Sequence, residues 1–319
     1  MTLKNLNLRP TDWTSFTGQD NTVKSIQIAI KASQKRKEPL EHILLYGPPG
    51  LGKTTLANII AKDLNTNIKT TSGPALTRSG DLASILTSLE PGDILFIDEI
   101  HRLNKNVEEA LYPAMEDYKL DIVLGKGPGA RTLRLDLNPF TIIGATTKAG
   151  AISSPLRDRF GLVHRLTYYS PKDLEQIIKN ACAVLGIKPD AESATEIAKR
   201  SRGTARIALK LLRRVRDYCL IEHQSKPNLE LTQKGLKFYQ VDHAGLDETD
   251  RKLLEAIINL HNGGPVGLQT LASLISEDID TITDVNEPFL LQTGFLMKTA
   301  RGRVATPKAY HHLHLKKRG

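Results

Sequence analysis

The sequence predicts an α/β domain with a parallel sheet, then a small all-helical domain, then a C-terminal module of helices and a β-ribbon. Up to about residue 170, short apolar runs alternate with helical patterns, which is typical of a parallel sheet covered by helices. Only helical patterns follow from there to about residue 242. Three more helical patterns and two short basic extended runs complete the chain. We therefore expect domains at 1–170, 171–242 and 243–319.

Composition bounds the class of protein. A chain of 319 residues is too long for one ordinary core, and 40% apolar with 25% charged residues is a normal globular composition. No run of eighteen uncharged apolar residues and no secretory signal pattern is found, so we expect no membrane contact and a cytoplasmic location. Cys182 and Cys219 lack metal-ligand spacing and are expected to be buried thiols. The net charge of +9 favours a polyanionic partner, although it could simply keep the surface solvated.

Five apolar runs are the expected strands of the sheet, and three helical patterns form the small domain. The strands are expected at 42–47, 67–72, 93–98, 140–147 and 164–169. The helices are expected at 171–185, at about 189–200 and at about 203–221.

The C-terminal module has its own pattern. Its helices are expected at 250–262, 268–277 and 286–292, and two extended runs meet around Ala300 to Gly302. Three helices with a basic β-ribbon is the layout of a winged helix-turn-helix module. Residues 311–319 are expected to be a loose basic tail.

GPPGLGKTT, residues 47–55, matches the phosphate-loop pattern GxxxxGK[ST]. A strand-like run precedes it and a helical run follows, so its backbone N–H groups and the helix N-terminus can hold phosphates. Lys53 would reach the terminal phosphates, and Thr54 would hold Mg²⁺ through its hydroxyl. The alternative is a bare strand-to-helix turn.

DILFIDEIHRL supplies what hydrolysis needs beyond binding. Asp98 ends an apolar strand where it can accept Mg²⁺ or its water, and Glu99 can orient and deprotonate the attacking water. A solvated strand end is the alternative. The two stretches together indicate ATP hydrolysis.

With these residues the sequence resembles the AAA+ ATPases, the ring-forming branch of P-loop enzymes. By that resemblance GATT at 144–147 is sensor 1, which places Thr147 near the γ-phosphate; a strand ending in small polar residues is the alternative. SPLRDRF at 154–160 resembles the arginine-finger segment, in which Arg159 rather than Arg157 would reach the γ-phosphate of the adjacent subunit. The resemblance implies that a monomer is not fully active.

Arg206, in GTARIALKLLRR, matches the sensor 2 position of the same family. The alternative is a solvated basic face, because Arg206, Lys210, Arg213 and Arg214 share one side of the expected helix.

Further stretches narrow the resemblance to the RuvB family of bacterial Holliday-junction branch-migration motors. These stretches are LRPTDWTSFTGQ, GPPGLGKTTLA, FIDEIHRL, GATTKAG, SPLRDRFG and TGFLMKTARGRVATPKAY, and they cover essentially the whole chain in order. The resemblance adds nucleotide contacts that spacing cannot show. With the phosphate-loop lysine, the implied set is Leu8, Arg9, Gly50, Thr54, Thr55, Glu116, Asp117, Tyr118, Arg159, Tyr169 and Arg206.

The stretch LDIVLGKGPGARTLRLDL, residues 120–137, predicts a β-hairpin with its turn at GKGPG, within a span of about 118–138. Alternation places Leu120, Ile122 and Leu124 on one face, and the returning run carries Leu133, Leu135 and Leu137. So small a hairpin is expected to leave an apolar patch for a partner. The resemblance implies that this partner is RuvA, and a hairpin packed on its own domain is the alternative.

The ribbon carries Lys298, Arg301 and Arg303 near its tip, where they can meet phosphates without reading bases. The resemblance singles out Lys298 and Arg303 as DNA contacts. Position 298 is Lys in this sequence, where the family often has Arg. Sequence-independent binding suits a motor that acts on any duplex.

The resemblance implies an ATP- and Mg²⁺-dependent motor, a homo-hexamer that pumps duplex DNA at four-way junctions in recombination, repair and the SOS response, with RuvA and RuvC as partners. Two alternatives stay open. One is a clamp-loader-type or other replication-associated AAA+ ATPase, and the other is a nucleotide-switched winged-helix regulator of DNA.

Overall fold

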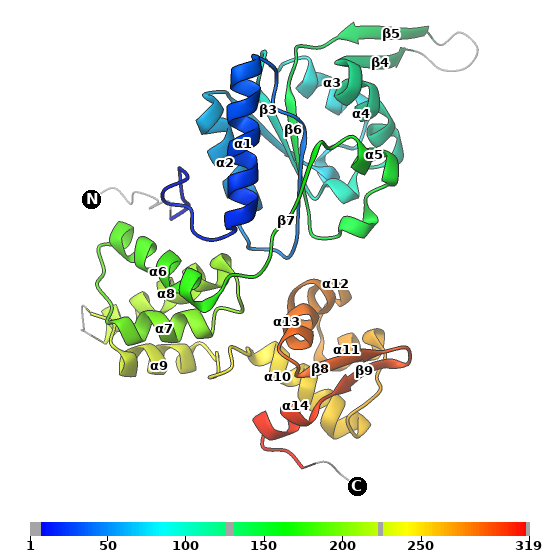
Figure 1. Cartoon of the computed structure of the whole chain (residues 1–319). Coiled ribbons are helices and arrows are strands. Elements are labelled where there is room, and N and C mark those ends of the chain that lie inside the picture. The colour runs from blue at the N-terminus through cyan, green and yellow to red at the C-terminus, as the bar shows by residue number, and fades with distance from the viewer. Residues whose placement is uncertain (1–7, 125–130, 223–225, 317–319) are drawn as a thin grey trace. The chain divides into compact units, whose positions relative to one another are not determined.

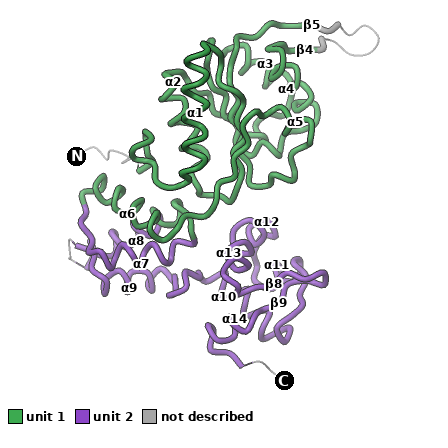
Figure 2. Tube along the Cα trace, viewed as in Figure 1, with its two compact units in different colours: residues 1–186, 203–209 green, residues 187–202, 210–319 purple. Residues whose placement is uncertain are grey.

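The computed structural model describes residues 8–124, 131–222 and 226–316 (Figure 1). The chain divides into two compact units, shown in two colours in Figure 2. The first holds the residues up to 186 together with 203–209, and the second holds 187–202 and the residues from 210 onward.

A five-stranded sheet forms the centre of the first unit, in the order β2-β3-β6-β1-β7, and all its pairings are parallel. The strands are β1 (Ile43–Tyr46), β2 (Ile68–Ser72), β3 (Ile94–Asp98), β6 (Thr141–Thr146) and β7 (Leu162–Arg165). The predicted parallel sheet is confirmed, but the last strand was placed wrongly at 164–169. It begins at Leu162, whose amide donates to the carbonyl of His42, and after Leu166 the backbone turns away so that the Tyr169 amide meets the carbonyl of Gly203.

Helices cover both faces of this sheet. Figure 1 shows α1 (Asp20–Arg36) and α2 (Lys53–Leu64) along one face, with α4 (Lys105–Asp117) and α5 (Ser154–Asp158) along the other. Among the residues that the structure describes, this part of the chain also contains α3 (Ser79–Leu86) and the 3-10 turns Gly73–Ala75, Ile100–Arg102 and Ala149–Ala151. The sequence of α4 explains where the helix begins, because the Asn104 side chain caps it by accepting from the amide of Val107. Its buried residues are Val107, Leu111, Ala114 and Met115, a helical spacing that faces the core.

The predicted hairpin is present as β4 (Lys119–Leu124) and β5 (Arg131–Asp136), paired antiparallel. Leu120 pairs with Leu135 and Ile122 with Leu133. At the base, Leu120 is buried in the core and Ile122 packs against it, whereas Leu133 is 46% exposed. The predicted turn at GKGPG lies outside the described residues. The base of the hairpin therefore packs on its own domain, while Leu133 is exposed.

Four helices follow: α6 (Pro171–Leu185), α7 (Ala191–Lys199), α8 (Ala205–Ile221) and α9 (Leu229–Phe238). The first three match the predicted helices closely. The fourth was missed, although Asn228 caps it by accepting from the amide of Leu231. An Asn before a short amphipathic run was the signal available, and Gly235 within the run weakened it. The cysteines are buried free thiols as predicted, and burial raises the pKa of Cys182 to about 11.

The C-terminal residues form the predicted winged helix. It contains α10 (Glu248–Glu255) with a π-helical turn (Ala256–Leu260), α11 (Leu268–Ile275), α12 (Ile279–Thr281) with a π-helical turn (Ile282–Asn286), and α13 (Glu287–Gln292). The ribbon is β8 (Leu296–Thr299) and β9 (Gly302–Ala305). The expectation of a loose tail from residue 311 was wrong as far as 316, because α14 (Pro307–His312) is capped by Thr306, and Leu313 and Leu315 pack on the core of this domain.

Among the described residues, none of the helices is both long and apolar enough to cross a bilayer.

Candidate nucleotide and DNA sites

The phosphate loop joins β1 to α2 at the carboxyl end of the sheet, and two of its glycines are required by their surroundings. Gly47 has φ +143°, and a Cβ there would lie 2.4 Å from the carbonyl oxygen of Leu166. Gly50 has φ +81°, and its Cβ would lie 2.8 Å from Cβ of Arg206. Close approach on both sides fixes the path of the loop, which leads directly into the N-terminus of α2.

Lys53 is buried at the first position of α2, with its ammonium turned back into the loop. Its Nζ donates to the carbonyl oxygens of Gly47 and Pro48, at 2.8 and 2.9 Å. Burial lowers the pKa of Lys53 to about 8, the charge of Asp98 opposes this shift, and the charge of Arg206 adds to it. The structure thus brings Lys53, Asp98 and Arg206 within electrostatic reach of one another, as a phosphate site requires.

Asp98 and Glu99 lie where β3 ends. Oδ1 of Asp98 accepts from the amide of Glu99 at 2.9 Å, and Glu99 itself has a left-handed φ of +48°. The Glu99 carboxylate pairs with Nη1 of Arg102 at 3.1 Å, with both side chains about half exposed. Thr54 is partly exposed in the first turn of α2. Its hydroxyl and the Asp98 carboxylate are hard oxygen ligands, which is the donor set that Mg²⁺ prefers.

The sensor 1 segment ends β6. Thr146 is buried, its Oγ1 lies 2.9 Å from Nδ1 of His101, and it accepts from the amide of Lys148. Thr147 follows directly with an exposed side chain at the carboxyl end of the sheet. Sequence reasoning identified Thr147 but missed the Thr146–His101 pair, because no spacing pattern joins positions 45 residues apart.

Tyr169 and Phe16 contact the phosphate loop. The Tyr169 hydroxyl donates to the carbonyl of Leu51 at 2.9 Å, and burial raises the pKa of this phenol. A Cβ on Gly52 would lie 3.2 Å from the ring of Phe16, a neighbour that sequence reasoning also missed. At the start of the described chain, Leu8 is partly buried and Arg9 is exposed. Thr55 lies beside Thr54 in the first turn of α2.

Arg206 lies in the first turn of α8, and its amide donates to the carbonyl of Gly50 at 3.4 Å. The predicted sensor 2 residue is therefore in contact with the phosphate loop through its backbone.

Arg159 lies at the end of α5 and is held by α4 and α5. Its Nη2 pairs with Oε1 of Glu116 at 3.1 Å, its Nη1 donates to the carbonyl of Pro155 at 2.6 Å, and its guanidinium carbon lies 4.2 Å from the centroid of the Tyr112 ring. Glu116 is followed by Asp117 and Tyr118 at the C-terminal end of α4. The structure thus pairs the predicted arginine finger with Glu116, another predicted nucleotide contact.

The ribbon residues differ in how freely they are presented. Lys298 and Arg303 face each other in register across the ribbon, and both point to Glu287, whose side chain is 4% exposed. Arg303 Nη2 lies 2.9 Å from this carboxylate and its side chain is 14% exposed, whereas Lys298 Nζ lies at 3.6 Å and its side chain is 59% exposed. Lys298 can therefore reach a phosphate directly, while Arg303 is held by Glu287.

An ion-pair cluster inside the second unit joins Arg202 to the start of α10. Arg202 Nη2 lies 2.5 Å from Oδ2 of Asp250 and 2.7 Å from Oδ2 of Asp247, and Nδ2 of Asn286 donates to Oδ1 of Asp250. Asp250 is fully buried. Burial raises the pKa of this carboxyl to about 6, although the Arg202 charge opposes the shift.

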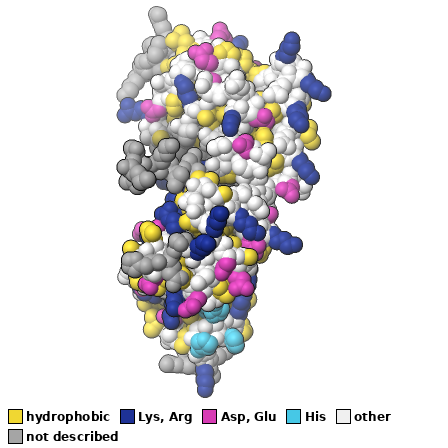
Figure 3. All heavy atoms as spheres, turned by 90° about the vertical axis from the view of Figure 1, so that its left-hand side faces the viewer, with side chains coloured by type: hydrophobic (Ala, Val, Ile, Leu, Met, Phe, Trp, Pro, Cys, Tyr) yellow, Lys and Arg dark blue, Asp and Glu magenta, His cyan; other side chains and the backbone are white. Residues whose placement is uncertain are grey.

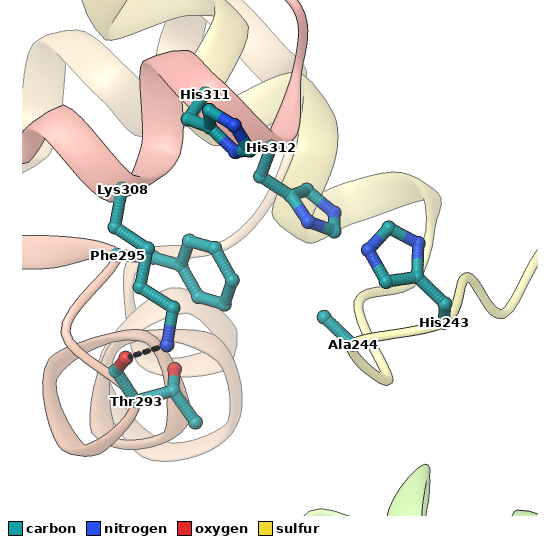
Figure 4. A pocket seen from close by; sticks show the side chains of 7 residues that line it. All are labelled: His243, Ala244, Thr293, Phe295, Lys308, His311 and His312. Atoms are coloured by element: carbon teal, nitrogen blue, oxygen red, sulfur yellow. Dashed lines mark hydrogen bonds between the residues drawn. The ribbon is translucent and has the colours of Figure 1, made fainter.

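A pocket of about 430 Å³ in the same unit lies beside a histidine cluster (Figure 4). Asp242, His243 and His312 could together offer three ligands to a metal. However, His312 Nε2 already lies 2.7 Å from Oδ2 of Asp242, and the Arg251 guanidinium lies 3.8 Å from the same oxygen. A nearby positive charge opposes cation binding, so we interpret the contact between His312 and Asp242 as a hydrogen bond that fastens α14 to the segment before α10.

On the face seen in Figure 3, lysine and arginine side chains are spread among acidic and apolar ones. The net charge of +9 is not gathered into one patch on this face.

Comparisons with known proteins give one consistent result. The family model described as "Holliday junction DNA helicase RuvB P-loop domain" matches residues 8–166, "RuvB AAA lid domain" matches 169–242, and "RuvB C-terminal winged helix domain" matches 243–314. A solved structure, the Thermotoga maritima RuvB Holliday junction branch migration motor, is 50% identical with a TM-score of 0.88, over 97% of this chain and 99% of that one. A lysine-to-arginine mutant of that protein gives a TM-score of 0.89 at 50% identity, and an arginine-to-alanine mutant gives 0.89 at 49%, with the same coverage.

Proposed function

Because this chain belongs to the RuvB family of Holliday junction DNA helicases, we propose that it is the ATP-hydrolysing motor that drives branch migration of four-way DNA junctions. The observation that carries this function is the ordered match of P-loop, lid and winged-helix domains over residues 8–314, together with the phosphate loop and Asp98 at one edge of the sheet. These matches do not favour a clamp-loader-type ATPase or an operator-binding regulator. We further propose that the motor acts in the bacterial cytoplasm, in recombination, repair and the SOS response.

The proposed chemistry at the phosphate loop follows from its donors. Lys53 would exchange its two carbonyl partners for the terminal phosphates of ATP, and Thr54 and Asp98 would hold Mg²⁺. When bound, the Mg²⁺ ion would neutralise charge on the β- and γ-phosphates. Glu99 orients and deprotonates the attacking water, which requires its carboxylate to leave Arg102. Thr147, which is exposed, would contact the γ-phosphate or the attacking water.

The site is proposed to be shared between subunits. Arg159 is held against α4 by Glu116, and Asp117 and Tyr118 follow Glu116 at the end of that helix; the family resemblance assigns all three to nucleotide. This grouping supports a face that completes the neighbour's site, with Arg159 stabilising negative charge in the transition state. A homo-hexameric ring is the proposed assembly.

The proposed partners use other surfaces. Lys298 and Arg303 on the ribbon contact duplex DNA through its phosphates. The hairpin β4–β5 engages RuvA, supported by the exposure of Leu133 beyond a base that packs on its own domain. RuvC would join at the same junction, in a resolvasome.

A junction assay tests the function directly. A labelled four-way junction is incubated with the chain, ATP and Mg²⁺, with and without RuvA, and conversion to duplex products is followed. We expect migration that RuvA strengthens and that Lys53→Ala abolishes. ATP-dependent loading of a sliding clamp, or binding to a single operator sequence with no migration, would contradict the proposed function.

Mixed rings test the shared site. Lys53→Ala and Arg159→Ala chains are each expected to be inactive alone, and mixing them should return ATPase activity wherever an intact loop meets an intact arginine. Absence of recovery in rings that demonstrably mix would show that Arg159 does not act in trans.

A further inference from the structure

We propose that Tyr112 is a positioning residue for Arg159, an aromatic platform on which the guanidinium is presented to the neighbouring subunit. The proposal rests on the trans-acting role of Arg159 and adds a residue that carries no known motif.

The contacts around Arg159 leave few directions open to it. The Tyr112 ring lies under the guanidinium, with the guanidinium carbon 4.2 Å from the ring centroid, which is the geometry of a cation–π contact. Pro155 accepts from Nη1 at 2.6 Å, and Glu116 pairs with Nη2 at 3.1 Å. Nε is buried and has no partner among the described residues. Only 21% of the side chain is exposed, so the orientation of its charged end is set by Tyr112, Pro155 and Glu116.

Tyr112 is fixed in turn by polar contacts. Its hydroxyl donates to Oε1 of Glu108 at 2.6 Å, one helical turn earlier in α4. The hydroxyl of Ser153 donates to the same carboxylate oxygen and also caps α5 by accepting from the amide of Leu156. Burial and the Glu108 carboxylate raise the pKa of the Tyr112 phenol, so it stays a donor. The platform and the helix that carries Arg159 are therefore joined through Glu108.

The three groups that hold Arg159 have different exposure. The Tyr112 ring packs against the core around α4, whereas the Glu116 carboxylate is 55% exposed. An incoming phosphate can replace an exposed carboxylate more easily than a packed ring, because both phosphate and carboxylate are oxyanions that pair with arginine. Glu116 is thus the contact that the arginine can exchange, and Tyr112 is the contact that it keeps. Stabilising a transition state requires a charge already in position, which is what a retained platform supplies.

Three variants separate the ring from the hydroxyl. Tyr112→Leu removes the π face and is expected to lower kcat for ATP about tenfold or more, with KM within about twofold, as for loss of a contact made in the transition state. Tyr112→Phe keeps the ring and should retain kcat within about threefold. Tyr239→Leu is the matched control, because Arg214 lies 5.2 Å from that ring centroid in the helical domain, and its kcat should be unchanged. Thermal unfolding and sedimentation of each variant report whether fold and ring are intact.

Mixed rings then show where Tyr112 acts. Tyr112→Leu should recover activity with Lys53→Ala, because an intact loop again meets an intact arginine, and should not recover with Arg159→Ala, which lacks the same contribution. Full activity of Tyr112→Leu alone, a rise in KM instead of a fall in kcat, or failure to recover with Lys53→Ala while Arg159→Ala does recover would overturn the proposal. If Arg159→Ala itself does not recover with Lys53→Ala, the trans-acting role fails instead.

Discussion

The hydroxyl of Tyr169 donates a hydrogen bond to the carbonyl oxygen of Leu51, 2.9 Å away inside the phosphate loop. Tyr169→Phe would leave that carbonyl without this donor in a buried setting, which costs about 1 kcal/mol or more. We expect ATP affinity to fall several-fold, measured with a fluorescent nucleotide. Tyr168→Phe is the control, because the adjacent ring lies next to Gly203 and no hydrogen bond joins its hydroxyl to the loop in the part of the chain that the structure describes. Equal losses in both variants would contradict this role of Tyr169.

Gly50→Ala places a methyl group 2.8 Å from Cβ of Arg206 on a backbone with φ +81°. The left-handed conformation alone costs an alanine about 1–2 kcal/mol. We expect weaker nucleotide binding and a lower unfolding temperature, measured by calorimetry. Gly80→Ala is the matched control, because nothing lies within 4 Å of its Cβ and its helix α3 favours alanine. A Gly50→Ala chain with unchanged affinity would show that the loop can move away from Arg206.

Asp250 gives a pH dependence of stability. Its pKa is about 6 in the folded chain, mainly because it is buried, whereas an exposed aspartate has a pKa near 4. Between these values the folded state holds more protons than the unfolded state, so Asp250 makes the free energy of unfolding fall as pH rises from about 4 to about 6. Asp250→Asn should remove this contribution, at most about 1.4 kcal/mol per pH unit. Denaturant unfolding at pH 4, 5, 6 and 7 measures the free energy of unfolding of the original chain and of Asp250→Asn. An identical pH dependence in the two would contradict the assignment of this effect to Asp250.

We expect Lys298→Ala and Arg303→Ala to differ in their effects on DNA binding and on stability. Lys298→Ala removes an exposed charge, so duplex affinity should fall for all sequences and the salt slope should shrink by about 1, with stability changed by no more than about 0.5 kcal/mol. Arg303→Ala also leaves buried Glu287 without its closest partner, which should destabilise the winged helix by about 3 kcal/mol.

Adding Glu287→Gln to Arg303→Ala should recover part of that stability, since the uncompensated charge is removed. DNA titrations at several salt concentrations and thermal melts of the same preparations check both expectations. Loss of binding to a single sequence after Lys298→Ala would contradict contact through phosphates.

The elements that the sequence predicts well are those whose signals are local. The apolar runs of β1, β3 and β6 are buried over nearly their whole length, and such runs are readable because both faces of a parallel strand are covered. The boundary of β7 was missed because it depends on pairing with β1, 119 residues earlier at Leu162 and Ile43. Helix α14 was missed because a cluster of histidines and lysines looks solvated until Leu313 and Leu315 find the winged-helix core.

The residues of the site likewise fall into those that a local motif predicts and those that only the folded structure reveals. Lys53 and Asp98 belong to contiguous motifs, and the structure brings their charges together as their positions at the carboxyl ends of strands imply. Glu287 and Tyr112 carry no motif, and their importance arises only from what folding places beside them, namely Arg303 and Arg159. Contacts of this kind are set by tertiary packing, so no local sequence pattern predicts them.

The crowding at Gly47 restricts which residue can evolve at this position. Every other amino acid brings at least a Cβ, and at this position that atom would enter the space of the Leu166 carbonyl, which is itself backbone and has no side chain to give way. A library encoding all twenty residues at position 47, selected for survival of DNA damage, should therefore return glycine codons alone. The backbone just after the strand that ends at Arg165 thus restricts which residue a loop more than 110 residues earlier in the chain can carry.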